Sequence, residues 1–312
     1  MFYMARFNTK TALFVIAYTV SLISAVKANE VDLNYLHNTV KFLTKIHPPR
    51  NYKNPQSLDR AANFIFQEGK KYTSNIEIQK YRVDLIEYKN IILRFGKADQ
   101  AIKVIGAHYD VYGNLPGADD NASGVAGLLL LAKYIAQEPE ELKGSVELVF
   151  YTLEEPPYFR SKFMGSYIHA KSLKDKNLKV SYMLSLECIG YYSDEDDSQS
   201  YPLILGWFYP DRGNFIAGVG RRDDKELLNN LQESFDRHSK IEIVTLAAPS
   251  LITGIDFSDH KNYWEFGWPA AMITDTAFMR NKNYHQPDDT IDTLNFEKMQ
   301  MVVEGVYSTV LK

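Results

Sequence analysis

Residues 102–110, Ile102-Lys-Val-Ile-Gly-Ala-His-Tyr-Asp110, decide the fold that the rest of the chain is expected to adopt. The apolar run predicts a buried strand, and His108 and Asp110 follow at its polar end. After a loop, the apolar segment 125–135 predicts a helix that packs on a sheet. A strand that ends in polar residues and leads through a loop into a helix is where open α/β sheets bind ligands.

Strand-like and helical patterns alternate along the remaining chain. Strands are expected at 76–83, 90–95, 145–153, 180–188, 241–246 and 269–275, a short apolar segment at 215–220, and helices at 31–46, 57–72, 166–173, 224–238 and from about 295 onward. This alternation predicts an α/β fold in three layers, a mainly parallel mixed sheet with helices on both faces. Because no repeat or change in composition divides the chain, residues 29–312 are expected to form one domain.

Residues 1–28 have the pattern of a secretory signal peptide. Arg6 and Lys10 precede an apolar run, residues 11–26, and Val26-Lys-Ala28 resembles a small-residue cleavage site. A retained membrane anchor is the alternative, but about 16 apolar residues are fewer than the roughly 20 that span a bilayer. We therefore expect an exported protein, periplasmic or secreted, with no membrane attachment after cleavage.

Charge and cysteine content exclude further classes of function and structure. Removal of residues 1–28 changes the net charge from −4 to −7, because three cations and no acid are lost. Such an acidic protein is not expected to bind nucleic acid, which requires clustered lysine and arginine. Cys188 is the only cysteine, so no disulfide can form within the chain, and we expect a buried thiol without chemistry.

Metal-ligand side chains stand at the ends of several predicted strands. They are His108, the pair Glu154-Glu155, Glu187, and His285 after a fourth strand; Asp120 follows His108 by twelve residues. Parallel strands place their carboxyl ends on one edge of a sheet, so these residues are expected to converge. Two histidines and three carboxylates suit two divalent ions bridged by one carboxylate. One of the adjacent glutamates can bind metal while the other acts as a base.

The ordered motifs resemble those of the M28 (aminopeptidase Y/leucyl aminopeptidase-like) zinc metallopeptidases. They are His108-Tyr-Asp110, Gly117-Ala-Asp-Asp-Asn-Ala-Ser-Gly124, Glu154-Glu155, Ser185-Leu-Glu-Cys-Ile-Gly190, Ser258-Asp-His260 and Tyr284-His-Gln-Pro-Asp-Asp-Thr290. The similarity extends from about Val83 to the C-terminus.

The resemblance implies a di-zinc aminopeptidase that acts on peptides with a free N-terminus through a metal-bridging hydroxide. It implies two metal sites that share Asp120, the first with His108 and Glu187 and the second with Glu155 and His285. Glu154 would be the general base. Position 187 is more often aspartate in the family, and we expect the glutamate here to serve as a ligand on a longer arm.

The resemblance also implies roles for two neighbours of the ligands. Asp110 would accept a hydrogen bond from the second ring nitrogen of His108 and fix its tautomer. Tyr284 would stabilise the oxyanion of the reaction intermediate.

Two other functions remain open. A glutaminyl-peptide cyclase with a single zinc shares this type of fold, and a non-catalytic binding module could use the same scaffold. Among the weaker candidates, Asp119 is expected to shape its turn and His260 to be structural. His169 is expected on a helix surface, and the aromatic cluster 207–209 in the core or lining a substrate pocket.

Overall fold

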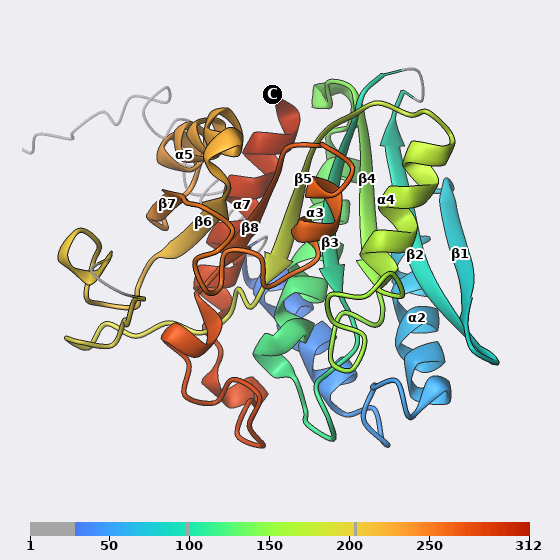
Figure 1. Cartoon of the computed structure of the whole chain (residues 1–312), viewed down its shortest axis with the longest axis horizontal. Coiled ribbons are helices and arrows are strands. Elements are labelled where there is room, and N and C mark those ends of the chain that lie inside the picture. Colours follow the sequence, from blue (N-terminus) through green and yellow to red (C-terminus); the bar gives the residue numbers. More distant parts are fainter. Residues whose placement is uncertain (1–28, 98–99, 203–204) are drawn as a thin grey trace, which may run out of the picture.

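Eight strands in the described part of the chain form a single sheet (Figure 1). The computed structural model describes residues 29–97, 100–202 and 205–312, so the predicted signal peptide lies outside the described residues. The strands are β1 (Ile76–Val83), β2 (Ile86–Gly96), β3 (Ile102–His108), β4 (Ser145–Tyr151), β5 (Val180–Glu187), β6 (Ile216–Gly220), β7 (Ile243–Ala247) and β8 (Ala270–Thr274). Their order across the sheet is β1-β2-β4-β3-β5-β8-β6-β7.

The four strands at the centre of the sheet run parallel. β3 pairs in parallel with β4 and with β5, and β5 pairs in parallel with β8. β6 and β7 are also parallel to each other, while the β1–β2, β2–β4 and β6–β8 pairings are antiparallel. The prediction of a mainly parallel mixed sheet is confirmed. The carboxyl ends of β3, β4, β5 and β8 therefore share one edge.

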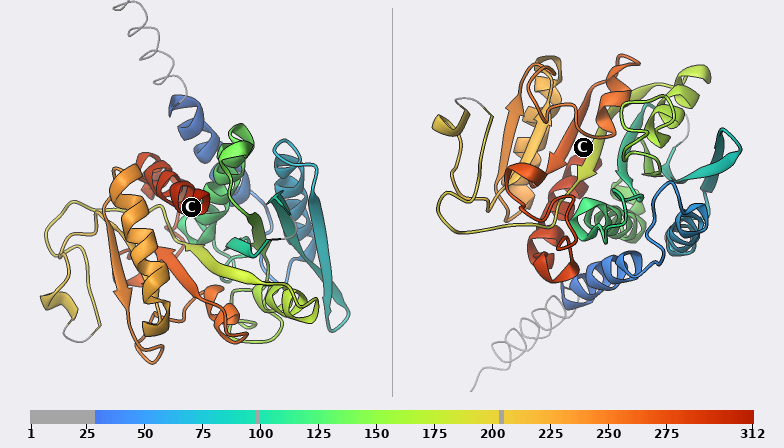
Figure 2. Two further views of the ribbon diagram at one scale, coloured as in Figure 1. Left: turned by 90° about the horizontal axis from the view of Figure 1, so that it is seen from above. Right: turned by 60° about the horizontal axis from the view of Figure 1, so that its bottom comes forward.

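Helices cover both faces of the sheet (Figure 2). A helix over residues 29–44 packs on one face together with α2 (Pro55–Gly69), α3 (Gly124–Gln137), α5 (Lys225–His238) and α7 (Phe296–Leu311). The other face carries α4 (Gly165–Asp175) and α6 (His260–Trp264), around a second apolar cluster. Every residue of β4 is buried, as expected for a strand covered on both sides. The three-layer prediction is thus confirmed.

Short helical turns connect these elements. They are Pro139–Glu141, Leu205–Trp207, Arg222–Asp224, Ala277–Met279 and Ile291–Thr293, with a π-helical turn at Ala118–Ser123. β4 ends two residues before the predicted position 153, because Leu153 has a φ of 62°, in the left-handed region that interrupts extended backbone. Among the described residues, no helix combines the length and apolar character needed to cross a membrane.

Candidate metal centre

The predicted ligands converge at the shared carboxyl edge of the central strands. His108 is the last residue of β3 and Glu187 the last residue of β5, and Glu154 and Glu155 follow the end of β4. Asp120 lies in the π-helical turn that precedes α3. These five side chains are buried, while His285, in the loop after β8, is 23% exposed and borders the solvent.

Two groups of potential ligands share Asp120. In the first, Nε2 of His108 lies 3.3 Å from Oδ1 of Asp120 and 3.4 Å from Oε1 of Glu187. In the second, Nε2 of His285 lies 2.9 Å from Oδ2 of Asp120 and 3.4 Å from Oε2 of Glu155. Within each group the ligand atoms lie within 4.8 Å of one another. The two oxygens of one carboxylate thus face two different imidazoles, the arrangement expected of a bridging ligand.

Several polar atoms in this cluster have no hydrogen-bond partner. They are Oδ1 of Asp120, Oε1 of Glu155 and Nε2 of His285, and all three are shielded from solvent. Buried polar atoms are rarely left unsatisfied in native proteins unless an ion or a water completes their contacts. Imidazole and carboxylate are ligand types that zinc accepts. The donor set therefore fits metal ions.

Burial and neighbouring charges shift the pKa values of several side chains in this cluster. Burial raises the pKa of Glu155 to about 8, and burial likewise raises the pKa of Glu154 well above its ordinary value. Burial would lower the pKa of His285, but its contacts with Asp120 and Glu155 raise it to about 10. Carboxylates held this close together require compensating positive charge, which protons or metal ions can supply.

The sequence profile of peptidase family M28 matches residues 90–310, more than half of the chain. The chain belongs to peptidase family M28. This membership makes it a zinc-dependent peptidase and confirms the resemblance found in its motifs.

Individual relatives of this M28 peptidase include an uncharacterised protein, YfbL of Escherichia coli K12. The two are 45% identical over 280 residues, which cover 87% of this chain and 85% of that one. Leucine aminopeptidase 1 of the fungus Pyrenophora teres f. teres is 26% identical, and the aligned part covers 86% of this chain and 67% of the fungal one.

Solved structures resemble the M28 chain in fold. LapB from Legionella pneumophila superimposes with a TM-score of 0.72 at 22% identity, covering 89% of this chain and 71% of that one. A glutaminyl cyclase from an Acidobacteriales bacterium gives a TM-score of 0.66 at 20% identity, covering 89% and 93%.

Asp110 has a second set of contacts that the motif alone did not indicate. Its two carboxylate oxygens accept hydrogen bonds from the backbone N–H groups of Glu154 and Glu155, at 3.2 and 3.1 Å. Its Oδ1 lies 3.5 Å from Nδ1 of His108, which makes no hydrogen bond in this geometry. Asp110 therefore positions the backbone of both glutamates, and it also lies next to the imidazole of His108.

His285 is held between two tyrosine rings. Tyr284 stacks on one face of the imidazole, with ring centroids 4.0 Å apart, and Tyr112 stacks on the other face at 4.2 Å. Tyr112 follows Asp110 by two residues, but nothing in the sequence indicated that it would meet a residue more than 170 positions away. The two rings restrict the orientation of the imidazole.

The loop that contains Asp120 is fixed by buried polar contacts. Asp289 accepts hydrogen bonds from the backbone N–H groups of Asp119 and Asp120, at 2.8 and 3.2 Å. The side chain of Asp119 accepts hydrogen bonds from Gly190 N and from the amide of Asn281. Asp119 thus lies in a structural network, in agreement with the role expected for it.

Arg50 supports the same loop from the opposite end of the chain. The buried guanidinium donates to the carbonyl oxygens of Leu43, Tyr109, Pro116 and Gly117, at 3.1, 2.9, 2.7 and 2.6 Å. It thereby connects the end of the first helix to the segments that carry His108 and Asp120. Nothing in the sequence indicated this role, because Arg50 follows two prolines in a polar loop.

Two expectations about side chains outside the cluster were wrong. His169 is buried, since its helix turns it towards β4, where Nε2 lies 3.0 Å from Oε2 of Glu147. Trp207 and Phe208 are exposed by 83% and 73%, because their turn extends away from the sheet, whereas Tyr209 lines a cavity. His260 is structural as expected, with Nε2 donating to the carbonyl oxygen of Ile255 at 2.8 Å.

Proposed function

We propose that this M28 chain is an exported aminopeptidase that holds two zinc ions and removes N-terminal residues from peptides. The observation that supports this most directly is the division of the Asp120 carboxylate between two ligand groups. Oδ1 faces His108 and Oδ2 faces His285. A site for a single ion does not need a carboxylate placed in this way.

Each ion would have three protein ligands. His108, Asp120 and Glu187 would hold one, and Asp120, Glu155 and His285 the other. Bound zinc would supply Lewis acidity, lowering the pKa of a water molecule and polarising the scissile carbonyl. The chain's own contribution is to fix the ligand orientation through Asp110, Asp289 and the tyrosine stack.

Glu154 is proposed as the general base. Its Oε2 lies 3.9 Å from Nε2 of His108, and Glu154 could also form a ligand group with His108 and Glu155, but it belongs to neither of the two groups that share Asp120. It can accept a proton from water and return it to the leaving amine. Tyr284 is half-buried near the carboxylates of Asp120, Glu155 and Glu187, and its hydroxyl is proposed to donate to the oxyanion.

Replacement of the base tests this assignment. Glu154→Gln is expected to keep the zinc content while kcat falls by at least about 100-fold, the usual contribution of a general base. Leucyl- and alanyl-p-nitroanilide are suitable substrates, and Glu140→Gln, an exposed glutamate on the far side of the molecule, is the matched control. Unchanged turnover in Glu154→Gln would remove this residue from the mechanism.

The main alternative is a glutaminyl-peptide cyclase, whose fold resembles this chain. The shared Asp120 favours the peptidase, because the cyclase uses one zinc. Metal analysis of the purified protein and incubation with a glutaminyl peptide separate the two. One zinc and loss of ammonia without release of an amino acid would support the cyclase. No chelator-sensitive product from either substrate type would support a binding module.

The free N-terminus and the export of the protein are part of the same proposal. An N-acetylated peptide is expected to resist cleavage, whereas the same peptide with a free amine is hydrolysed. Removal of residues 1–28 leaves residues 29–312 as the working domain. N-terminal sequencing of protein recovered from the periplasm or the medium tests this, and an N-terminus that includes residues 1–28 would contradict it.

A further inference from the structure

The loop that follows Glu155 is folded into successive turns. The backbone N–H groups of Tyr158 and Ser161 donate to the carbonyl oxygens of Glu155 and Tyr158, at 3.1 and 2.9 Å. The loop closes where Gly165, the first residue of α4, donates to the carbonyl oxygen of Thr152 at 2.8 Å. Side chains on this loop are therefore held at defined places close to the proposed metal ligand Glu155.

Arg160 on this loop is fixed by contacts with the segment that precedes α6. Its Nη2 donates to Oδ1 of Asp256 at 2.6 Å, and its guanidinium lies over the ring of Phe257, 5.1 Å from the ring centroid. The guanidinium also lies over Phe159, at 5.4 Å. An ion pair and two cation–π contacts restrict the orientation of the group. The side chain is nevertheless 47% exposed, so it borders the solvent.

Most of the hydrogen-bonding capacity of this guanidinium is unused. Arginine carries five N–H donors in a fixed plane. The bond to Asp256 is the one that the side chain of Arg160 makes among the residues that the structure describes. A guanidinium binds a carboxylate through two parallel hydrogen bonds. A carboxylate that approaches from the solvent would thus meet donors that Asp256 and two aromatic rings already hold in place.

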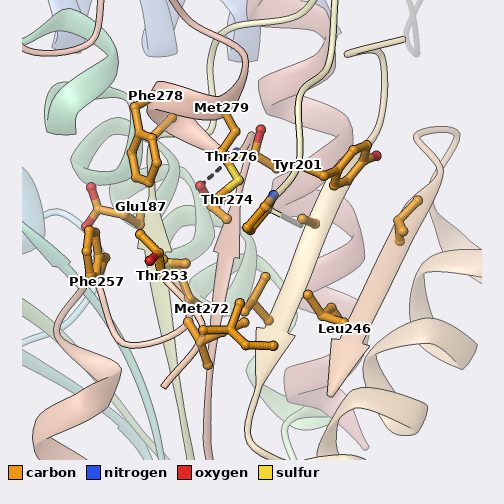
Figure 3. A pocket seen from close by; sticks show the side chains of 18 of the residues that line it. Glu187, Tyr201, Leu246, Thr253, Phe257, Met272, Thr274, Thr276, Phe278 and Met279 are labelled. Atoms are coloured by element: carbon orange, nitrogen blue, oxygen red, sulfur yellow. Dashed lines mark hydrogen bonds between the residues drawn. The ribbon is translucent and has the colours of Figure 1, made fainter. Parts of the chain in front are cut away.

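A row of aromatic rings connects Arg160 with the candidate metal centre. Phe257 lies 5.9 Å from Phe278, and Phe278 lies 5.8 Å from Tyr284, measured between ring centroids. All three rings line the same pocket as Glu187 (Figure 3). An extended peptide advances about 3.5 Å per residue, so about five residues at most cover the path from Tyr284 to the guanidinium.

We propose that Arg160 binds the C-terminal carboxylate of the substrate, which makes short peptides with a free C-terminus the preferred substrate class. The inference rests on the proposed aminopeptidase function, which places the scissile carbonyl at the metal centre beside Tyr284. The rest of the peptide then extends towards Arg160, and its terminal carboxylate pairs with the unused N–H donors. Longer peptides carry this carboxylate past the guanidinium, and amidated peptides lack it.

Amidation of the substrate's C-terminus tests this contact. The substrates are alanyl peptides of two to six residues, each with a free carboxylate and as the C-terminal amide. We expect kcat/KM to be at least about tenfold higher for the free carboxylate at one or more lengths up to five residues, since bidentate pairs with arginine are among the strong hydrogen bonds. A ratio near one at every length would overturn the inference.

An acidic side chain offers the same chemistry as a C-terminal carboxylate. Amidated peptides that end in glutamate separate the two sources, because they keep a carboxylate on the side chain alone. We expect these peptides to be hydrolysed as slowly as the other amides. Full recovery of kcat/KM with them would overturn the assignment of Arg160 to the C-terminus.

Substitutions assign the preference to this side chain. Arg160→Gln should lower the ratio of carboxylate to amide kcat/KM to about one, whereas Arg160→Lys, which keeps the charge but not the planar fork, should retain part of it. Arg237→Gln, which removes an exposed, ion-paired arginine from α5, is the matched control and should keep the full ratio. An equal loss of rate on both substrate forms in Arg160→Gln would show that the residue only supports its loop.

Calorimetry separates this inference from the proposed function. Its ligands are the same short peptides with a reduced scissile bond, which cannot be hydrolysed. If p-nitroanilides are cleaved but the carboxylate and the amide behave alike, only the assignment of Arg160 fails. If nothing is cleaved, yet the carboxylate form binds at least about tenfold more tightly and Arg160→Gln removes the difference, the aminopeptidase proposal fails and the carboxylate site stands. Equal binding without any cleavage would overturn both.

Discussion

Ser258 donates a hydrogen bond from its Oγ to Oε2 of Glu187, with the two atoms 2.7 Å apart. The other carboxylate oxygen of Glu187 faces His108. Ser258 is itself 2.8 Å from the hydroxyl of Ser185 on β5. The carboxylate of Glu187 therefore has a hydroxyl partner that orients it towards His108.

Removal of this partner should weaken one metal site. Ser258→Ala is expected to lower zinc affinity at the site of His108 and Glu187 by about 10- to 100-fold, because groups that orient ligands contribute this much. Zinc titration against a competing chelator provides the measurement. Ser234→Ala, which removes a buried hydroxyl from α5, is the control. Equal zinc affinities in the two variants would show that Ser258 does not contribute to metal binding.

Substitution of Asp120 and substitution of His285 should release different amounts of zinc. Asp120→Ala removes a ligand from both groups, so we expect less than one zinc per chain after dialysis. His285→Ala affects only one group and should retain about one zinc, with His238→Ala, an exposed histidine, as the control. Metal analysis distinguishes these results. Loss of the same amount of zinc from both variants would contradict a shared carboxylate.

Arg50 is expected to be essential for stability. Arg50→Met leaves four buried carbonyl oxygens without their donor, and this should cost at least about 3 kcal/mol of unfolding free energy. Arg50→Lys should also be destabilised, since one ammonium cannot reach all four acceptors. Urea unfolding measures both, with exposed Arg82→Met as the control. A loss below 0.5 kcal/mol, typical of surface changes, would refute this role.

The buried Glu147 should make stability depend on pH. Burial alone would raise its pKa, but the hydrogen bond with His169 and the charge of Arg94 lower it to about 2. A folded-state pKa below the unfolded value of 4.5 means that the stabilisation is fully present above pH 4.5 and is lost as the pH falls towards 2. Its size is on the order of 3 kcal/mol.

Comparison with a variant isolates this contribution. The difference in unfolding free energy between wild type and Glu147→Gln should be largest above pH 5 and should decrease between about pH 4.5 and pH 3. Exposed Glu226→Gln should show no such change. A difference that stays constant over this range would show that the ionised carboxylate does not stabilise the fold.

Much of the fold and the convergence of the proposed ligands followed from the sequence. The strand ends at His108 and Glu187 were predictable because apolar runs stop at polar residues, and parallel pairing places such ends together. His169 was misjudged because its helical pattern does not indicate which face meets the sheet. The acidic Glu147 within an otherwise apolar strand was the available signal that a buried partner was needed.

Contacts between distant segments could not be predicted in the same way. The stacking of Tyr112 on His285 and the four contacts of Arg50 depend on how loops pack after the sheet has formed. Ser258 and Asp289 lie in motifs that were recognised, but their partners appear only in the three-dimensional arrangement.

The position of Arg50 also limits how the protein can be shortened. The family match begins at residue 90, forty residues after the arginine that holds the carbonyl of Gly117. An expression boundary drawn at the start of the match would discard α2 and β1 together with this guanidinium. The shortened polypeptide would retain every proposed zinc ligand. It would lack the Arg50 guanidinium, which holds the loop that carries Asp120 in place.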